Sequence, residues 1–369
     1  MPGSAFGARP DAGAAGGPEH ALCAAPVPVL TYHQIDVPPA RGTPFRSLTV
    51  HPKVFGRHMR WLARLGYRGL SMRELMPYLA GARSGKVFGL TFDDGFLNVH
   101  RHALPVLRER ASALAIPLYS ENDGWLAEEK GAPLWISQGD YLTSRMIYED
   151  VEPFSVARMV DLFRQHGLVE SAATAFVQRG NAYKTGIWPH PLKYRQLFAG
   201  DRLKIGEHTW CTIVGYGHAA EHMSLYCDEL RVLISGDMLL PRISTNIAVQ
   251  AVNPDGDPLR LFLASIDAFL ALPADTLVLP AHGRPFRGIH DRVAQLHAHH
   301  VERCNVLLKA CKGKAASAAE LIPALFEREF DDIHQTMFAM GEAIAHLNHL
   351  WHAGRLRRLE TGDVIRFIG

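Results

Sequence analysis

The sequence predicts an α/β protein made of two unlike blocks and a small tail, and three features of its hydrophobic pattern carry this prediction. From Val27 to about Arg110, short apolar runs alternate with helical patterns, which is typical of a parallel sheet. Between Gly139 and Trp188, helical stretches follow one another without a strand signal. The stretch from Leu203 to Ile243 then contains short apolar runs separated by turn residues, which indicates antiparallel strands.

The first block begins after residues 1–26, whose Ala-, Gly- and Pro-rich composition predicts disorder. These residues lack the continuous apolar core, flanked by basic residues, that a signal peptide needs. The runs "VPVLTY" and "KVFGLTF" are predicted strands. A helix is predicted from Pro52 to Leu65, because Phe55 and Met59 begin an apolar stripe at helical spacing and Gly66 follows as a stop.

The second block continues with a helix that begins at Asp257 as N-cap and Pro258 as first residue. The run "DTLVLPAHG" then returns a strand to the sheet. The tail, residues 334–369, is predicted to be a helix followed by two short strands about a Thr-Gly-Asp turn, and it resembles a winged helix. Packing of this tail against the main domain is the alternative interpretation. Histidines in "HAHH" (297–300) and at 346, 349 and 352 are expected on solvated or partly packed helix faces.

Composition excludes several classes of partner. Lys and Arg number 39 against 37 Asp and Glu, and "RLRR" is the main basic cluster, so we expect no nucleic acid as a partner. No apolar run reaches the length of a membrane helix, so we expect no membrane either. The five cysteines have no C-x-x-C spacing and an odd count, which favours buried thiols in a reducing compartment. We therefore expect a cytoplasmic protein.

Two adjacent carboxylates, Asp93 and Asp94, end the run "LTFDDG", and Gly95 permits a turn that brings both to one mouth. Carboxylates at the end of a buried strand need a metal, a cation or several donors to compensate them. With "LTYHQI" and "FGRHMRWLARLGYRGLSMREL", this motif makes residues 27 to about 110 resemble the N-terminal part of polysaccharide deacetylases of the NodB homology type. The resemblance implies that Asp93 is the general base and that Asp94 binds metal. It ends near Arg110, before the His-x-x-x-His motif that would supply the remaining ligands.

A second resemblance covers the rest of the chain. "GYGHAAEH", "LISGDMLLPRIS" and "LVLPAHGRPFRG", in this order, resemble the C-terminal two thirds of a metallo-β-lactamase-fold hydrolase of the glyoxalase II-like branch. The resemblance implies that His218 is a ligand of a first metal, Asp237 a bridging carboxylate and His282 a ligand of a second metal. The metal would be zinc or iron. The H-x-H-x-D-H motif that completes such a centre would fall on "LAIPLYSEND", where no histidine occurs.

These observations predict the following organisation: a truncated deacetylase-type segment (27–118), an incomplete αββα domain (119–333) and the winged-helix-like tail (334–369). The leading interpretation is a metal-dependent hydrolase of a thioester, ester or lactone, impaired by its missing ligands. One alternative is removal of N- or O-acetyl groups from a polysaccharide, and another is a noncatalytic fusion product. The partner would be a small molecule or a carbohydrate. We further expect that "VPVLTY", "KVFGLTF" and "ALAIPLY" partly replace the lost opening strands of the αββα domain, or that this domain is prone to aggregation.

Overall fold

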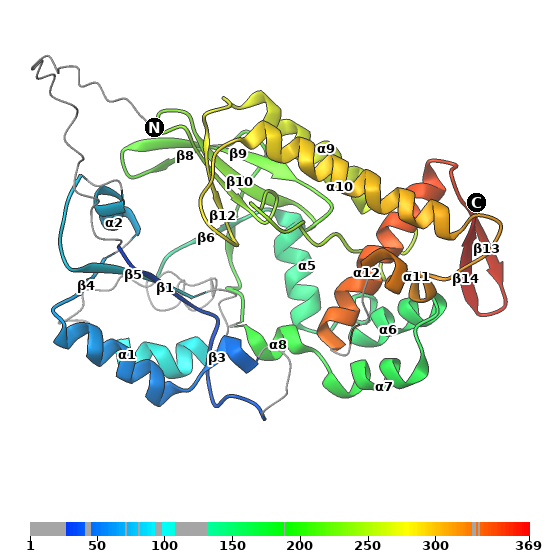
Figure 1. The fold of residues 1–369 in the computed structure, drawn as a ribbon, viewed down its shortest axis with the longest axis horizontal. Helices are drawn as coiled ribbons and strands as arrows, with labels where there is room; N and C mark the ends of the chain where they lie inside the picture. Colours follow the sequence, from blue (N-terminus) through cyan, green and yellow to red (C-terminus); the bar gives the residue numbers. More distant parts are fainter. Residues whose placement is uncertain are drawn as a thin grey trace, which may run out of the picture.

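The computed structural model describes residues 27–40, 46–70, 72–79, 82–92, 98–107, 131–187, 189–326, 330 and 333–369. It confirms a mixed α/β chain in which a small N-terminal part lies beside a larger body (Figure 1). Asp93, Asp94 and the stretch "ALAIPLY" lie outside the described residues.

The N-terminal part is built on a three-stranded parallel sheet of order β1-β5-β4, as the alternating pattern predicts. Phe55, Met59 and Phe88 are fully buried between this sheet and the first helix. That helix begins at Pro52, where the His51 side chain accepts a hydrogen bond from the Lys53 N–H. The elements are β1 (Val29–Tyr32), β2 (Gln34–Ile35), η1 (Arg46–Leu48), β3 (Thr49–Val50), α1 (Pro52–Arg64), β4 (Arg68–Gly69), α2 (Met72–Leu79), β5 (Val87–Phe92) and the π-helical turn η2 (Val99–Ala103).

A helical layer opens the larger body. Ser137 and Ser155 cap two of its helices, because their side chains accept hydrogen bonds from the backbone N–H groups of Asp140 and Arg158. Two short strands flank the layer and pair in parallel with each other, a pairing that the sequence did not indicate. The elements are β6 (Leu134–Ile136), α5 (Gln138–Tyr148), η3 (Glu152–Phe154), α6 (Val156–Gln165), α7 (Glu170–Arg179), α8 (Ala182–Gly186) and β7 (Tyr194–Gln196).

The central sheet has the order β12-β11-β10-β9-β8. Its first four strands in the chain are antiparallel, as predicted, and the last pairs in parallel with β11. The crossover between β11 and β12 contains α9, with Asp257 as N-cap and Pro258 as first residue, which confirms the predicted helix start. The elements are β8 (Arg202–Ile205), β9 (His208–Gly215), β10 (His222–Cys227), β11 (Val232–Gly236), α9 (Pro258–Asp267), η4 (Ala268–Ala271) and β12 (Leu277–Pro280).

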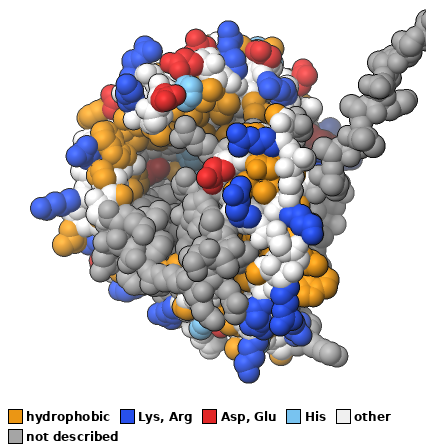
Figure 2. Space-filling model, turned by 90° about the vertical axis from the view of Figure 1, so that its left-hand side faces the viewer, with side chains coloured by type: hydrophobic (Ala, Val, Ile, Leu, Met, Phe, Trp, Pro, Cys, Tyr) orange, Lys and Arg blue, Asp and Glu red, His pale blue; other side chains and the backbone are white. Residues whose placement is uncertain are grey.

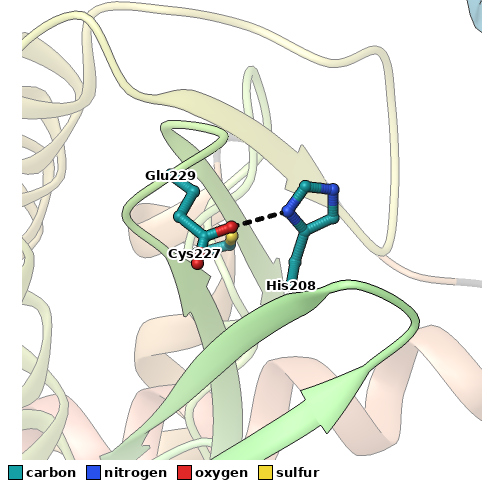
Figure 3. A group of neighbouring side chains, drawn as sticks. All are labelled: His208, Cys227 and Glu229. Atoms are coloured by element: carbon teal, nitrogen blue, oxygen red, sulfur yellow. Dashed lines mark hydrogen bonds and ion pairs between the residues drawn. The ribbon is translucent and has the colours of Figure 1, made fainter.

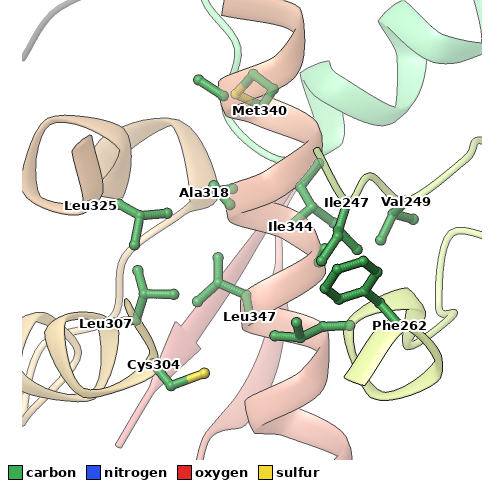
Figure 4. Close-up of a cluster of buried hydrophobic side chains, with 14 of the residues drawn as sticks. Ile247, Val249, Phe262, Cys304, Leu307, Ala318, Leu325, Met340, Ile344 and Leu347 are labelled. Atoms are coloured by element: carbon green, nitrogen blue, oxygen red, sulfur yellow. The ribbon is translucent and has the colours of Figure 1, made fainter. Parts of the chain in front are cut away.

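The C-terminal helix packs into the body rather than standing apart from it. Figure 4 shows Met340, Ile344 and Leu347 on this helix, facing Phe262 on one side and Leu307 on the other. All five of these side chains are fully buried. The elements of this region are α10 (Ile289–Ala310), α11 (Ala318–Phe326), α12 (Ile333–His352), β13 (Arg357–Thr361) and β14 (Val364–Ile368). The predicted helix and hairpin of the tail are therefore present. None of the helices in the described ranges is long and apolar enough to cross a membrane.

Two expectations need correction. His300 and His346 are not on solvated or partly packed faces, because both are buried and their rings meet, with Nδ1 of His300 3.1 Å from Nε2 of His346. The described strands β1 and β5 do not replace opening strands of the central sheet, because they pair with each other and with β4. The hydrophobic cores of the N-terminal part and of the larger body are likewise separate clusters.

Candidate metal centre

Three strand ends bring His218, Asp237 and His282 to one edge of the central sheet. Strands β9, β11 and β12 all run in the same direction, because β10 is antiparallel to both β9 and β11 and β12 is parallel to β11. Asp237 directly follows β11, and His282 lies two residues beyond β12. His218 follows β9 after a short turn. The sheet therefore gathers residues that are up to 64 positions apart in the chain (218 to 282).

Glycines at two of these strand ends allow the close packing of the site. Gly217 has a φ of +96°, and a Cβ at this position would clash with the Pro258 carbonyl oxygen at the start of α9. Gly236 has a φ of +53°, and its Cβ would clash with the His222 ring. A larger residue at either position would be strained and would displace its neighbour. The approach of α9 and of His222 to the site thus depends on glycine.

Asp237 lies between the two histidines. Its Oδ2 is 3.6 Å from Nε2 of His218, and its Oδ1 is 3.5 Å from Nε2 of His282. The three side chains are between 27% and 33% exposed, so they face a mouth that remains open to solvent. Nδ1 of His218 lies 2.8 Å from the Asn246 carbonyl oxygen and donates to it, which fixes the orientation of the ring.

The charges of this cluster support one another. Burial by itself would lower the pKa of His218, but its hydrogen bonds to Asp237 and to the Asn246 carbonyl outweigh burial and raise the pKa. Burial would raise the pKa of Asp237, and the hydrogen bond and the positive charge of His218 bring it below its usual value. The pKa of His222 is lowered, first by burial and then by the charge of His218.

A supporting layer surrounds the cluster, and the sequence pattern did not reveal its role. Nε2 of His222 accepts a 3.3 Å hydrogen bond from the Asp237 backbone N–H. Asp140 of α5 accepts from the Glu221 N–H at 2.9 Å, and the Glu221 carboxylate accepts from the Gly139 N–H at 2.7 Å. These contacts fix the 218–222 turn on the start of α5. The spacing of His222, four residues after His218, is a signal for this role, whereas nothing in the sequence indicates the Asn246 carbonyl.

The donor set fits part of a two-metal centre. Imidazole nitrogens and carboxylate oxygens are suitable ligands of zinc or iron. The ligand atoms of the three residues do not all lie within 4.8 Å of one another, as a single shared ion would require. Instead each histidine faces a different oxygen of Asp237. This arrangement is compatible with the predicted role of Asp237 as a bridging carboxylate. Within the described ranges, each oxygen of the Asp237 carboxylate thus has one imidazole nitrogen beside it.

Asp93 and Asp94 lie outside the described residues, as does the segment 114–123 where H-x-H-x-D-H would fall. His33 lies between β1 and β2 in the N-terminal part. The roles of Asp93, Asp94, His218, Asp237 and His282 as base and ligands stay predictions.

Comparisons with known proteins agree with this architecture. The model of the metallo-beta-lactamase superfamily matches residues 123–282, and the model of the metallo-beta-lactamase-like C-terminal domain matches residues 304–369. A beta-lactamase domain protein from Burkholderia ambifaria is 38% identical, with a TM-score of 0.65, over 75% of this chain and 82% of that one. A metallo-beta-lactamase family protein from Thermus thermophilus is 25% identical, with a TM-score of 0.59, over 73% of this chain and 86% of that one.

The N-terminal part has a different relative. YxkH of Bacillus subtilis (strain 168), a protein provisionally described as a polysaccharide deacetylase, is 33% identical over 102 residues, or 27% of this chain. The chain spans only 34% of the length of that relative. The chimera-like composition predicted from the sequence is therefore confirmed. By its two matching domain models and its sheet architecture, the chain belongs to the metallo-β-lactamase superfamily.

Proposed function

We propose that this chain is a metal-dependent hydrolase of the metallo-β-lactamase type whose activity is impaired by missing ligands. The observation that carries the proposal is the position of Asp237, with His218 at one carboxylate oxygen and His282 at the other. The proposed substrate is a thioester, an ester or a lactone, and the proposed metal is zinc or iron. When bound, such ions polarise a carbonyl group and activate water.

The residues of the chain hold and orient this centre. The Asn246 carbonyl accepts from Nδ1 of His218 and fixes the ring, so Nε2 is the nitrogen that would bind a metal once its proton is released. The Asp237 carboxylate would be the ligand shared by the two metals, and its backbone N–H donates a hydrogen bond to His222. Two protein ligands per position are fewer than the three or four that zinc sites normally have. The segment 114–123, which would supply the others, contains no histidine.

Metal analysis with a matched pair of variants tests the proposal. The purified chain should hold less than one zinc or iron ion at this centre and show little hydrolysis of a thioester, ester or lactone. Restoring H-x-H-x-D-H within residues 114–123 should raise both metal content and hydrolysis. Adding His282→Ala to the restored chain should remove the gain. If the restored chain gains neither metal nor activity, the proposal is wrong and the noncatalytic interpretation stands.

The N-terminal part supports polysaccharide deacetylation as a second candidate. Strands β1 and β5 pair in parallel with Tyr32 opposite Phe92, so His33 and the Asp93-Asp94 pair follow neighbouring strand ends. Such an edge is where a parallel sheet places ligand-binding residues. Two separate variants distinguish the candidates. Loss of bound metal in Asp94→Ala would identify the deacetylase-type site as the metal centre, and loss of bound metal in His282→Ala would identify the hydrolase-type site.

We also propose that the protein is a fusion that acts in the cytoplasm on a small molecule or a carbohydrate. The four described cysteines are all free thiols, and three of them are buried, which agrees with a reducing compartment. Figure 2 shows that on one face of the molecule basic, acidic and hydrophobic side chains are interspersed. This pattern agrees with the net charge of +2.

A further inference from the structure

A second cluster of metal-ligand side chains lies at the end of the central sheet opposite the candidate centre. His208 is the first residue of β9, Cys227 is the last residue of β10, and Glu229 follows in the turn toward β11. A strand rises about 3.3 Å per residue, so the eight residues of β9 place His208 more than about 20 Å from the edge that holds His218. The two clusters are therefore separate sites.

The strand register explains why these three side chains meet. Tyr226 pairs with Cys211 across β9 and β10, so Cys227 lies opposite Trp210. Residues two apart on a strand point to the same face, and so do residues directly opposite each other. His208 and Cys227 consequently share one face of the sheet, and the turn that follows β10 brings Glu229 to them. Figure 3 shows the three side chains pointing toward one another.

The ligand atoms are already close together. One nitrogen of His208, Sγ of Cys227 and one oxygen of Glu229 all lie within 4.8 Å of one another. No other three His, Cys, Asp or Glu side chains among the described residues bring their ligand atoms this close together. Nδ1 of His208 is 2.8 Å from Oε2 of Glu229. Cys227 is fully buried, whereas the side chains of His208 and Glu229 are 33% and 57% exposed. An ion can therefore enter from solvent past His208 and Glu229 and reach the thiol beneath.

From this arrangement we propose that His208, Cys227 and Glu229 bind one zinc ion, with a water molecule as fourth ligand. Thiolate, imidazole and carboxylate are each ligands that zinc accepts, and three protein ligands with a water molecule complete a tetrahedral site. Binding converts the Cys227 thiol into a thiolate, and its proton passes to solvent. Tetrahedral zinc holds a nitrogen and an oxygen ligand about 3.3 Å apart, so the His208–Glu229 contact must open by about 0.5 Å. The exposed Glu229 side chain can make this movement.

The charged residues next to the cluster are engaged with partners outside it. The next acidic residue, Asp228, lies in the turn after β10, where it accepts a 3.0 Å hydrogen bond from the Tyr226 hydroxyl and lies 3.9 Å from Arg231. The β8–β9 turn precedes His208, and β8 is the edge strand of the central sheet, with β9 as its one neighbour among the described strands. A bound zinc ion would therefore tie the β8–β9 turn to the β10–β11 turn.

Cobalt(II) titration of the full-length chain distinguishes this site from the candidate centre. A cobalt–thiolate bond gives an intense near-ultraviolet charge-transfer absorption, and the His218–Asp237–His282 cluster contains no sulfur. We expect this absorption at one equivalent of cobalt, and we expect zinc to displace it. Cys227→Ser should abolish the absorption. Glu229→Gln and His208→Gln, at partly exposed positions that do not threaten folding, should each weaken zinc binding at least about tenfold.

Two matched controls make the result specific. Cys211→Ser removes a neighbouring thiol outside the cluster, and Glu207→Gln removes an exposed carboxylate of the β8–β9 turn. Both variants should keep the absorption and the zinc affinity of the parent chain. The proposal is overturned if the parent gives no thiolate absorption, if Cys211→Ser abolishes it, or if the His208 and Glu229 variants bind zinc as tightly as the parent. In those cases His208 and Glu229 form an ion pair only.

Discussion

The buried carboxyl group of Glu342 should make the stability of this protein fall as the pH rises. Glu342 lies on α12 and is 7% exposed. Burial raises its pKa from 4.5 to about 7, and the nearby positive charge of Arg303 offsets only part of that effect. A carboxyl whose pKa is raised on folding contributes stability below its unfolded pKa and loses that contribution as the pH rises through its folded pKa.

Replacing Glu342 with Gln isolates this effect, because Gln is nearly isosteric and stays neutral. With 4.5 for the unfolded chain and about 7 for the folded one, ionisation favours the unfolded state by about 1.4 kcal/mol at pH 5.5 and by about 3 kcal/mol at pH 7.5. The stability advantage of Glu342→Gln should therefore grow by about 2 kcal/mol between these two pH values. Other groups titrate equally in both proteins, so they cancel in the difference.

The neighbouring histidines act in the opposite direction, which is why the comparison between variants is needed. Burial is the main cause that lowers the pKa of His300 to about 2 and of His346 to about 4. Their contribution to stability is present above the ordinary histidine pKa and is lost as the pH falls from about 6.5 toward those values. The pH profile of the parent protein alone therefore mixes effects of opposite sign.

Urea denaturation at pH 5.5, 6.5 and 7.5, followed by circular dichroism, measures the free energies of unfolding. Glu302→Gln, at an exposed position of α10, is the matched control and should stay within about 0.5 kcal/mol of the parent at each pH. If the difference between Glu342→Gln and the parent is the same at pH 5.5 and 7.5, the carboxyl does not titrate as its burial implies and the reasoning is refuted.

Further predictions concern packing and strand ends. Phe262→Ala, at a fully buried position, should destabilise the protein by about 3–5 kcal/mol in the same urea assay, and a smaller loss would mean that the core refills the cavity. Gly217→Ala should lower the melting temperature, because its left-handed backbone and the Pro258 carbonyl leave no room for a Cβ; an unchanged value would contradict this. Asp257→Asn should lose about 1 kcal/mol by weakening its 3.1 Å contact with His349, and equal stability would show that the ion pair is not needed. A chain that begins at Gly131 should melt cooperatively, because its core does not include the N-terminal clusters, and a noncooperative transition would contradict that separation.

The sequence predicted the elements whose signals are local. The start of α9 could be assigned because an N-cap at Asp257 and a proline at 258 are short-range signals, and hydrogen bonding at the cap confirms it. The antiparallel strands could be assigned because turn residues interrupt apolar runs at short intervals. His218, Asp237 and His282 were placed together by motif resemblance, and parallel strand directions explain why the fold brings them to one edge.

Features that depend on distant contacts could not be predicted. The burial of His300 and His346 results from the packing of α10 against α12, and a helical pattern of histidines looks the same on a buried face as on an exposed one. The pairing of β6 with β7 joins strands of three residues that are about 60 positions apart, too short for a period-two signal. The Asn246 contact uses a backbone carbonyl, which any residue provides.

The His218, Asp237 and His282 cluster is held by elements that have a hydrophobic core of their own. Val278 of β12, Leu233 of β11 and Phe262 of α9 belong to one buried cluster, which extends to Phe367 of the last strand and includes none of the N-terminal residues. The packing that positions Asp237 between its histidines therefore does not depend on the hydrophobic clusters of the N-terminal part. For that reason restoring the missing ligand segment is a stronger experiment than mutating the residues that remain: the frame that must receive the new ligands is already folded around the position where the metal would bind.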